Sequence, residues 1–258
     1  MKTIKMRKMM KVFFAFLVLA CMAAVVTAAP YGPRSVDVLG NDRRTEFNES
    51  VSSKQAQAGN VSLLMVNTST LTGRWQGYYG NISGIVTLQS ANGFRMYEWG
   101  NDAGISVAGE VYASNNTVGD WTRVLCVNLT GNSTNTSTYG PNATIIEAMY
   151  GAGISDIDGV DETFTGIEEI TVGNSNLINC PTAMLYNGSG SVNALNWNVT
   201  LLYENSTAIE TTRSIIYGAI IQNNENSFNN KTTDFQMIVG ENGGISAATT
   251  YYFYVELQ

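Results

Sequence analysis

Short apolar runs recur along the chain from Val61 to its end. They are rich in Val, Ile, Thr, Tyr and Trp, and clusters of Gly, Asn and Ser separate them. This composition and spacing are typical of β-strands joined by turns. The runs cover residues 61–66, 84–88, 94–99, 105–113, 121–129, 144–150, 164–172, 183–186, 195–203, 214–221, 235–239 and 249–257.

Alternation within these runs predicts which side chains face the core. At the C-terminus, apolar side chains at every second position share one face (Tyr251, Phe253, Val255 and Leu257). In the run 195–203, Val199 and Leu201 share a face, and Asn198 is predicted to point outward on the other. Asn92-Gly93 predicts a hairpin turn, because both positions tolerate a positive φ.

The fold class follows from the number of runs. No stretch keeps a 3.6-residue period, so we expect little helix, with Asp161–Glu169 as the one place for a short helical turn. About twelve strands predict an all-β antiparallel β-sandwich, Ig-like or jelly-roll-like. One domain over residues 60–258 is favoured over two smaller sandwiches joined near Thr138–Asn142, because a Cys126–Cys180 bridge would tie the halves together.

The N-terminus predicts export. Five basic residues within 1–11 precede an apolar run from Val12 to Val26, and Val26-Thr27-Ala28 places small residues before a cleavage point. We expect a signal peptide over residues 1–28 and a secreted, extracellular or cell-surface protein. Two alternatives are a lipoprotein cleavage box ending at Cys21 and an uncleaved membrane anchor.

Residues 29–59 are polar and contain Pro30, Pro33 and Gly40. They predict an N-terminal arm, which is either a flexible stalk or an extended strand donor.

Charge narrows the function classes. Only 14% of the residues are charged, and the net charge of −7 becomes 9 − 21 = −12 once residues 1–28 are removed, so nucleic acid is not an expected partner. The chain has no histidine, which excludes a Ser-His-Asp nucleophile and imidazole-ligated zinc.

Two cysteines, Cys126 and Cys180, remain after residue 28. Outside the cell they would most simply form one disulfide, the alternative being two buried thiols.

Asparagine acceptors of the form Asn-x-Ser/Thr dominate the motifs. The chain holds 27 Asn and 46 Ser plus Thr, so chance placement gives 27 × 46/258, or about five acceptors, and thirteen are present. Dense N-glycosylation is the favoured interpretation, and an Asn-rich loop composition is the alternative. The acceptors are Asn48, Asn60, Asn67, Asn81, Asn115, Asn128, Asn132, Asn135, Asn142, Asn187, Asn198, Asn205 and Asn230.

Acidic residues cluster around Gly159. Asp156, Asp158 and Asp161 could bind Ca²⁺ through their oxygens, although their order does not match an EF-hand and a solvated acidic loop is the alternative. No other cofactor is expected. A glycoside hydrolase needs two spaced carboxylates, but nothing in the sequence selects a pair, and we expect no enzyme.

Aromatic residues gather between Leu71 and Gly100. Trp75, Tyr78 and Trp99 could stack on sugars, or they could belong to the sandwich core.

Two motifs carry a resemblance. The stretch Trp75-Gln-Gly-Tyr-Tyr-Gly-Asn81 and the ending Tyr251-Tyr-Phe-Tyr-Val-Glu-Leu257 resemble those of uncharacterised secreted proteins of archaea. The resemblance implies an archaeal cell-surface setting and brings no activity or catalytic residue. Together with the export signal it predicts a structural glycoprotein, a filament, sheath or coat subunit whose partners are its own copies or other surface glycoproteins. Strand addition through the arm or the terminal strand would join copies. The alternative is a monomeric adhesin or carbohydrate-binding module.

Overall fold

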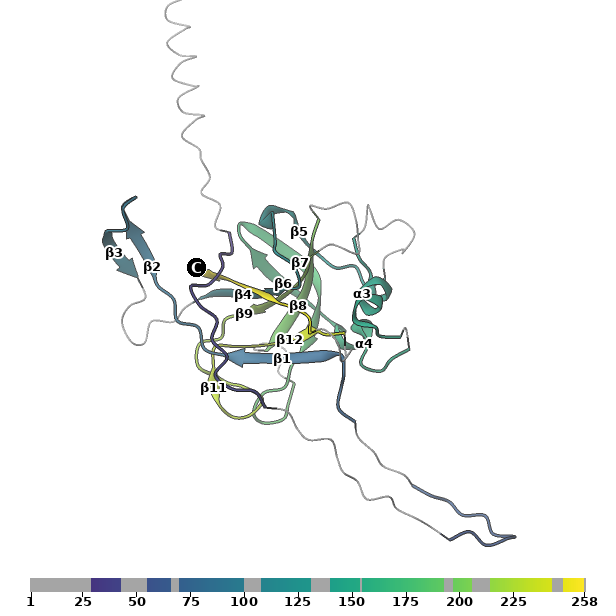
Figure 1. Ribbon diagram of the computed structural model, residues 1–258. Coiled ribbons are helices and arrows are strands. Elements are labelled where there is room, and N and C mark those ends of the chain that lie inside the picture. The colour runs from purple at the N-terminus through teal and green to yellow at the C-terminus, as the bar shows by residue number, and fades with distance from the viewer. Residues whose placement is uncertain are drawn as a thin grey trace, which may run out of the picture.

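A computed structural model describes residues 29–42, 55–65, 70–99, 108–130, 140–153, 155–192, 197–205, 214–242 and 248–257. The predicted signal peptide lies outside these residues. Within them the chain is an all-β antiparallel sandwich, as the sequence predicts, and it also contains two short α-helices and one 3₁₀ turn (Figure 1). The strands are β1 (Trp75–Gly80), β2 (Val86–Gln89), β3 (Arg95–Trp99), β4 (Gly109–Ser114), β5 (Val124–Cys126), β6 (Gly166–Val172), β7 (Ser175–Met184), β8 (Asn198–Glu204), β9 (Ile215–Ile220), β10 (Glu225–Asn226), β11 (Thr232–Thr233), β12 (Phe235–Gly240) and β13 (Tyr252–Leu257). The helices are η1 (Trp121–Arg123), α3 (Ala143–Tyr150) and α4 (Val160–Thr163), of which η1 is a single 3₁₀ turn.

Seven antiparallel strands form the central sheet, in the order β13-β4-β9-β8-β7-β6, with β5 also paired to β8. β4 and β5, from before residues 138–142, pair with strands from after them, so the two halves of the chain share one sheet. All seven residues of β8 are buried, which means that both faces of the sheet are covered.

The first face packs against β1, β12 and the two α-helices. β12 pairs with β1 in a separate two-stranded sheet, and its Met237 and Val239 join Leu201 and Tyr217 of the central sheet in the larger core. α3 adds Ile146 to the same core. Figure 1 places the β1–β12 ribbon across the central strands and α3 and α4 at one end of the body.

A chain of buried hydroxyl groups crosses this core. Tyr217 donates to the Tyr150 hydroxyl at 2.6 Å, Tyr150 and Tyr251 lie 3.5 Å apart, and Tyr251 donates to the Gly240 carbonyl at 2.5 Å. Burial raises the pKa of all three phenols, so they stay neutral. The network links α3, β9 and the segment before β13 without leaving a buried hydroxyl unsatisfied.

The second face is covered by the sheet itself. A register shift between Glu168 and Ile170 bends the β6–β7 hairpin, as β-bulges do. Its far end lies over β4 and β9, where Ile170 and Val172 pack with Tyr112 and Ile216. The Tyr112 hydroxyl donates to the Thr171 carbonyl at 2.7 Å and fixes the hairpin in this position.

The disulfide Cys126–Cys180 is confirmed, and it joins two strands that share one edge of β8. β7 pairs with β8 only over Thr182–Met184, since the next position, Pro181, has no N–H to donate. The Leu201 carbonyl instead accepts from the Val127 amide at 3.2 Å, and β5 continues the pairing from Leu202 to Glu204. The disulfide therefore closes the point where β5 replaces β7.

The expected strand over residues 144–150 is wrong, because this segment is helix α3. Asn142 caps its first turn by accepting from the Ile145 amide at 3.0 Å, and Gly151 ends it in the left-handed conformation. The buried positions 143, 146, 147 and 150 follow a helical spacing that the apolar run obscures. The short helical turn expected within Asp161–Glu169 is α4, and β6 follows it.

Of the other local predictions, some are confirmed and some are wrong. Gly93 adopts φ +80° at the β2–β3 turn, as predicted, and Ser90 pairs with Phe94 across it. The expected strand 61–66 is not formed over Val61–Met65, which pairs with no strand among the described residues, and residue 66 lies outside them. β1 is a strand that the apolar runs missed. In the arm, Tyr31 exchanges two backbone hydrogen bonds with Val255 of β13.

The disulfide generates the first prediction. The bridged cysteines are 54 residues apart, and closing a loop of this length stabilises a chain by roughly 4 kcal/mol relative to its open unfolded state. The double variant Cys126→Ala/Cys180→Ala should lose about that free energy of unfolding in a urea titration. Wild-type protein treated with reductant is the matched control. If the double variant and the reduced wild type each lost less than about 1 kcal/mol of their free energy of unfolding, the disulfide would not have a structural role.

Candidate functional site

The three predicted calcium ligands do not come together. Asp156 accepts from the Gly153 amide at 2.8 Å, and one of its oxygens lies 3.7 Å from the Arg74 guanidinium. Asp158 accepts from the Thr72 hydroxyl at 2.5 Å. Both carboxylates hold the loop between α3 and α4 against the segment before β1. Of the predicted set, only Asp161 belongs to the acidic cluster that the fold creates.

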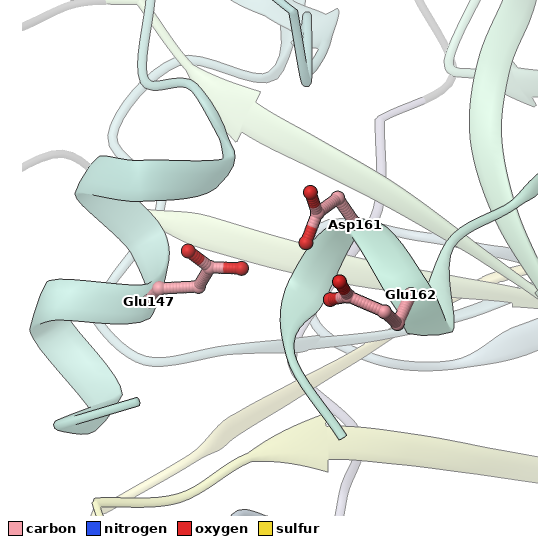
Figure 2. Close-up of side chains that lie close together, drawn as sticks. All are labelled: Glu147, Asp161 and Glu162. Atoms are coloured by element: carbon pink, nitrogen blue, oxygen red, sulfur yellow. The ribbon is translucent and has the colours of Figure 1, made fainter. Parts of the chain in front are cut away.

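That cluster consists of Glu147 from α3 and Asp161 and Glu162 from α4. One carboxylate oxygen of each residue lies within 4.8 Å of the other two. Figure 2 shows Glu147 pointing from its helix toward the two acids on the neighbouring one. Glu147 is 2% exposed, whereas the other two are exposed. Carboxylate oxygens are the ligands that Ca²⁺ prefers, so these residues could hold such an ion at the surface end of the cluster.

Glu147 also has a structural partner. Its Oε1 accepts from the Val160 amide at 3.1 Å, at the first residue of α4, where the N-cap Gly159 supplies no side chain. The approach is close, because a Cβ on Gly159 would meet Glu162 Oε2 at 2.5 Å and Glu147 Oε1 at 3.0 Å. Sequence reasoning missed Glu147. Its signal is its place in the helical spacing of α3, which the strand assignment concealed.

The carboxyl groups of the cluster differ in pKa because they lie close together. Burial raises the pKa of Glu147, and its hydrogen bond with Asp161 raises it further, while the Val160 amide opposes the rise. The hydrogen bonds from Glu162 and Glu147 lower the pKa of Asp161. The three acids therefore share a proton more readily than isolated carboxyl groups would.

Other buried acids also accept backbone amides from loops. Glu204 accepts from Asp120 at 2.7 Å, and Glu256 accepts from Gly173 at 2.8 Å. Asp234 accepts from Ile82 at 2.8 Å and, through its other oxygen, from the Asn224 amide at 2.9 Å. These carboxylates, which sequence alone left open as candidates for hydrolysis, each tie a loop to the sheet.

The predicted sugar-stacking residues are separated by the fold. Trp75 packs on Tyr150, Phe164 and Tyr217, and its Nε1 donates to the Asp158 carbonyl at 2.8 Å. Tyr78 stands edge-on to Phe253 in the same core. These two rings are core residues. Trp99 lies on β3, half exposed beside Tyr97 at a ring distance of 4.8 Å.

Nine of the thirteen asparagine acceptors lie in the described residues. Asn48, Asn67, Asn132 and Asn135 lie outside them. Four acceptors are exposed, namely Asn60, Asn81, Asn128 and Asn230, and three are half-buried, namely Asn115, Asn187 and Asn205. Asn115 and Asn187 accept hydrogen bonds through Oδ1, which leaves Nδ2, the atom that carries an N-glycan, available.

Asn142 and Asn198 are buried, against the expectation that every acceptor lies on the surface. They are 6% and 9% exposed. Asn142 is the N-cap of α3, and the Nδ2 of Asn198 donates to Glu168 Oε2. Asn198 was predicted to point outward because β8 alternates. The bent β6–β7 hairpin covers its other face, so both rows of side chains are buried.

Comparisons with protein-family models, with curated proteins and with solved structures find no match to the chain. In the part of the chain that the structure describes, no helix has the length and hydropathy needed to span a bilayer.

The acidic cluster predicts a pH dependence. Between the ordinary carboxyl pKa and the raised pKa of Glu147, the folded state holds a proton that the unfolded state has released. The free energy of unfolding therefore falls as pH rises through that window. Glu147→Gln keeps an oxygen for the Val160 amide and removes the titration, so it should flatten this fall in melting temperature.

The same variant tests calcium. Binding to the cluster predicts that millimolar Ca²⁺ raises the melting temperature of the wild type, that EDTA reverses the rise, and that Glu147→Gln shows a smaller one. Asp37→Asn, on the exposed arm, is the control for a general charge effect. Equal shifts in all three proteins would remove the cluster as a calcium site.

Burial predicts which asparagines carry glycans. Peptide mapping by mass spectrometry of exported protein should find sugars among Asn60, Asn81, Asn128 and Asn230. It should find Asn142 and Asn198 unmodified, because a glycan at either would break a cap or a buried hydrogen bond. A glycan on folded protein at Asn198 would contradict the placement of β8.

Proposed function

We propose that the chain is a secreted, N-glycosylated structural protein of the archaeal cell surface, whose copies assemble into a filament, sheath or coat. The observation that carries this proposal is the position of its apolar side chains. Val61–Met65 and the β2–β3 hairpin expose apolar residues and contribute none of them to either core. Contiguous exposed apolar surface is typical of protein contacts.

The disulfide and the acceptors support an extracellular setting. A disulfide persists in oxidising compartments and is rare in the cytosol. Glycans on the exposed asparagines would hydrate a surface with few charges, which 14% charged residues alone would do poorly. The resemblance to secreted archaeal proteins agrees with both features.

The buried acids favour a structural role over catalysis. Glu147, Glu204, Glu256 and Asp234 hold loops and helix ends through backbone amides, which is how a framework uses carboxylates. A monomeric carbohydrate-binding module would present several aromatic rings together. Of the three predicted rings, Trp75 and Tyr78 pack in the core, which leaves Trp99, half exposed beside Tyr97.

The proposal is tested on native, exported protein. Electron microscopy of purified material should show filaments or sheets, and deglycosylation should lower its mass toward the 27.9 kDa of the polypeptide or below, if residues 1–28 are removed. Monomeric particles at high concentration, with the mass of the bare polypeptide, would overturn both the assembly and the glycoprotein claims.

A further inference from the structure

The segment Val61–Met65 has the properties of a β-strand without a partner. It pairs with no strand in the described part of the chain, and Val61 and Leu63 are fully exposed, at 102% and 101%, with Met65 at 88%. In an extended strand these three side chains fall on one face because they alternate. The turn at Ala58-Gly59 precedes the segment. Within that turn the Asn60 amide donates a hydrogen bond to the Gln57 carbonyl. Figure 1 shows the segment standing well away from the body.

The β2–β3 hairpin is the second element outside the cores. It forms a two-stranded sheet that joins no other strand in the described part of the chain. The cross-strand pairs Val86–Trp99 and Leu88–Tyr97 place four apolar side chains on one face. All four are about half exposed. An isolated two-stranded hairpin is marginally stable in water, and a third strand stabilises it.

The low charge of Val61–Met65 and of the β2–β3 hairpin allows the segment of one copy to contact the hairpin of another. A chain with a net charge of −7, or −12 after export, repels its own copies. Between Lys54 and Arg95 the only charged residue is Arg74, so both Val61–Met65 and β2 lie in a stretch of the chain with a single charge. The hairpin's own charges, Arg95 and Glu98, form an ion pair with each other. Contact here brings together little like charge.

We propose that Val61–Met65 of one copy adds as a strand to an open edge of the β2–β3 hairpin of a second copy, placing Val61, Leu63 and Met65 beside the hairpin's apolar row. This inference rests on the proposed assembly and names the contact that makes it. Backbone pairing supplies affinity, and the alternating side chains supply register.

The placement of the two elements makes the contact directional. In Figure 1 the hairpin and Val61–Met65 project from opposite sides of the body, so a copy cannot join them to each other without rearrangement. An interface between two different surfaces is heterologous, and it builds open chains or rings rather than a closed dimer. One such contact is enough to generate a filament.

Two variants of the full chain test the two sides of the contact independently. Leu63→Asp places a charge on the strand donor, and Leu88→Asp places one on the hairpin. Leu39→Asp is the matched control, since Leu39 is equally exposed, at 98%, but lies in the arm. Each protein is checked for the Cys126–Cys180 bridge and for wild-type near-ultraviolet circular dichroism. We expect wild type and Leu39→Asp to assemble in sedimentation velocity, and each of the other two variants to stay monomeric alone.

Mixing gives the decisive result. Leu63→Asp keeps an intact hairpin and Leu88→Asp keeps an intact donor, so an equimolar mixture should form 1:1 dimers and stop there. Assembly of Leu63→Asp alone, with the wild type assembling, overturns this contact and leaves the proposed function standing. Two monomeric variants that give no dimer when mixed also overturn it. A wild type that stays monomeric at every concentration overturns the proposed function itself.

Discussion

The rest of the structure depends on the burial of β8 on both faces. Each residue from Asn198 to Glu204 is buried, so the central sheet needs apolar cover on two sides, and a single sandwich partner supplies only one. β1, β12 and the helices cover the first face. The chain covers the second by bending β6 and β7 back over β4 and β9, where Ile170 meets Gly218 so closely that a Cβ there would lie 2.7 Å from its side chain. Gly218 therefore allows the hairpin to close.

Covering both faces decides how polar groups are used. Loops that cross the covered sheet leave amides without strand partners, and an unpaired buried amide is costly. Glu204, Glu256 and Asp234 each accept such an amide, as Glu147 does for α4. The chain has few acids, and several of them are inside. The low surface charge is thus partly a consequence of the fold, and it leaves hydration of the outside to uncharged polar groups.

The sequence predicted the fold class well and the site poorly, for one physical reason. Alternation in 251–257 identifies β13 because Phe253, Val255 and Leu257 all pack on the larger core, although Glu256 on the opposite face is buried as well. β8 also alternates, but tertiary cover removes the difference between its faces, and Asn198 became a partner of Glu168 instead of a surface residue. Such cover comes from residues about 30 positions away and leaves no local signal.

Prediction from local sequence also failed for the helices. The run 144–150 contains two adjacent isoleucines, which favour strands, yet the Asn142 cap and the Gly151 stop select α3. Asn142 was counted as a glycan acceptor because the motif Asn-x-Thr and an N-cap use the same residue type. The acidic cluster could not be found until the helix placed Glu147 opposite Asp161. Asp161 alone was predicted, from the local density of acids.

The edges of the sheets explain why assembly through β2–β3 is more accessible than assembly through the terminal strand. β13 lies at the end of the central sheet, but Tyr31 of the same chain already exchanges two hydrogen bonds with Val255 on its outer side. Pro30 and Pro33 have no amide hydrogen, which limits this pairing to a single bridge at Val255. A donor strand at β13 would first have to displace Tyr31. At β2–β3 no described residue occupies either outer edge, so strand addition there adds hydrogen bonds without breaking any. An incoming strand therefore forms more new hydrogen bonds at the hairpin, whereas at β13 it competes with Tyr31 of the same chain for Val255.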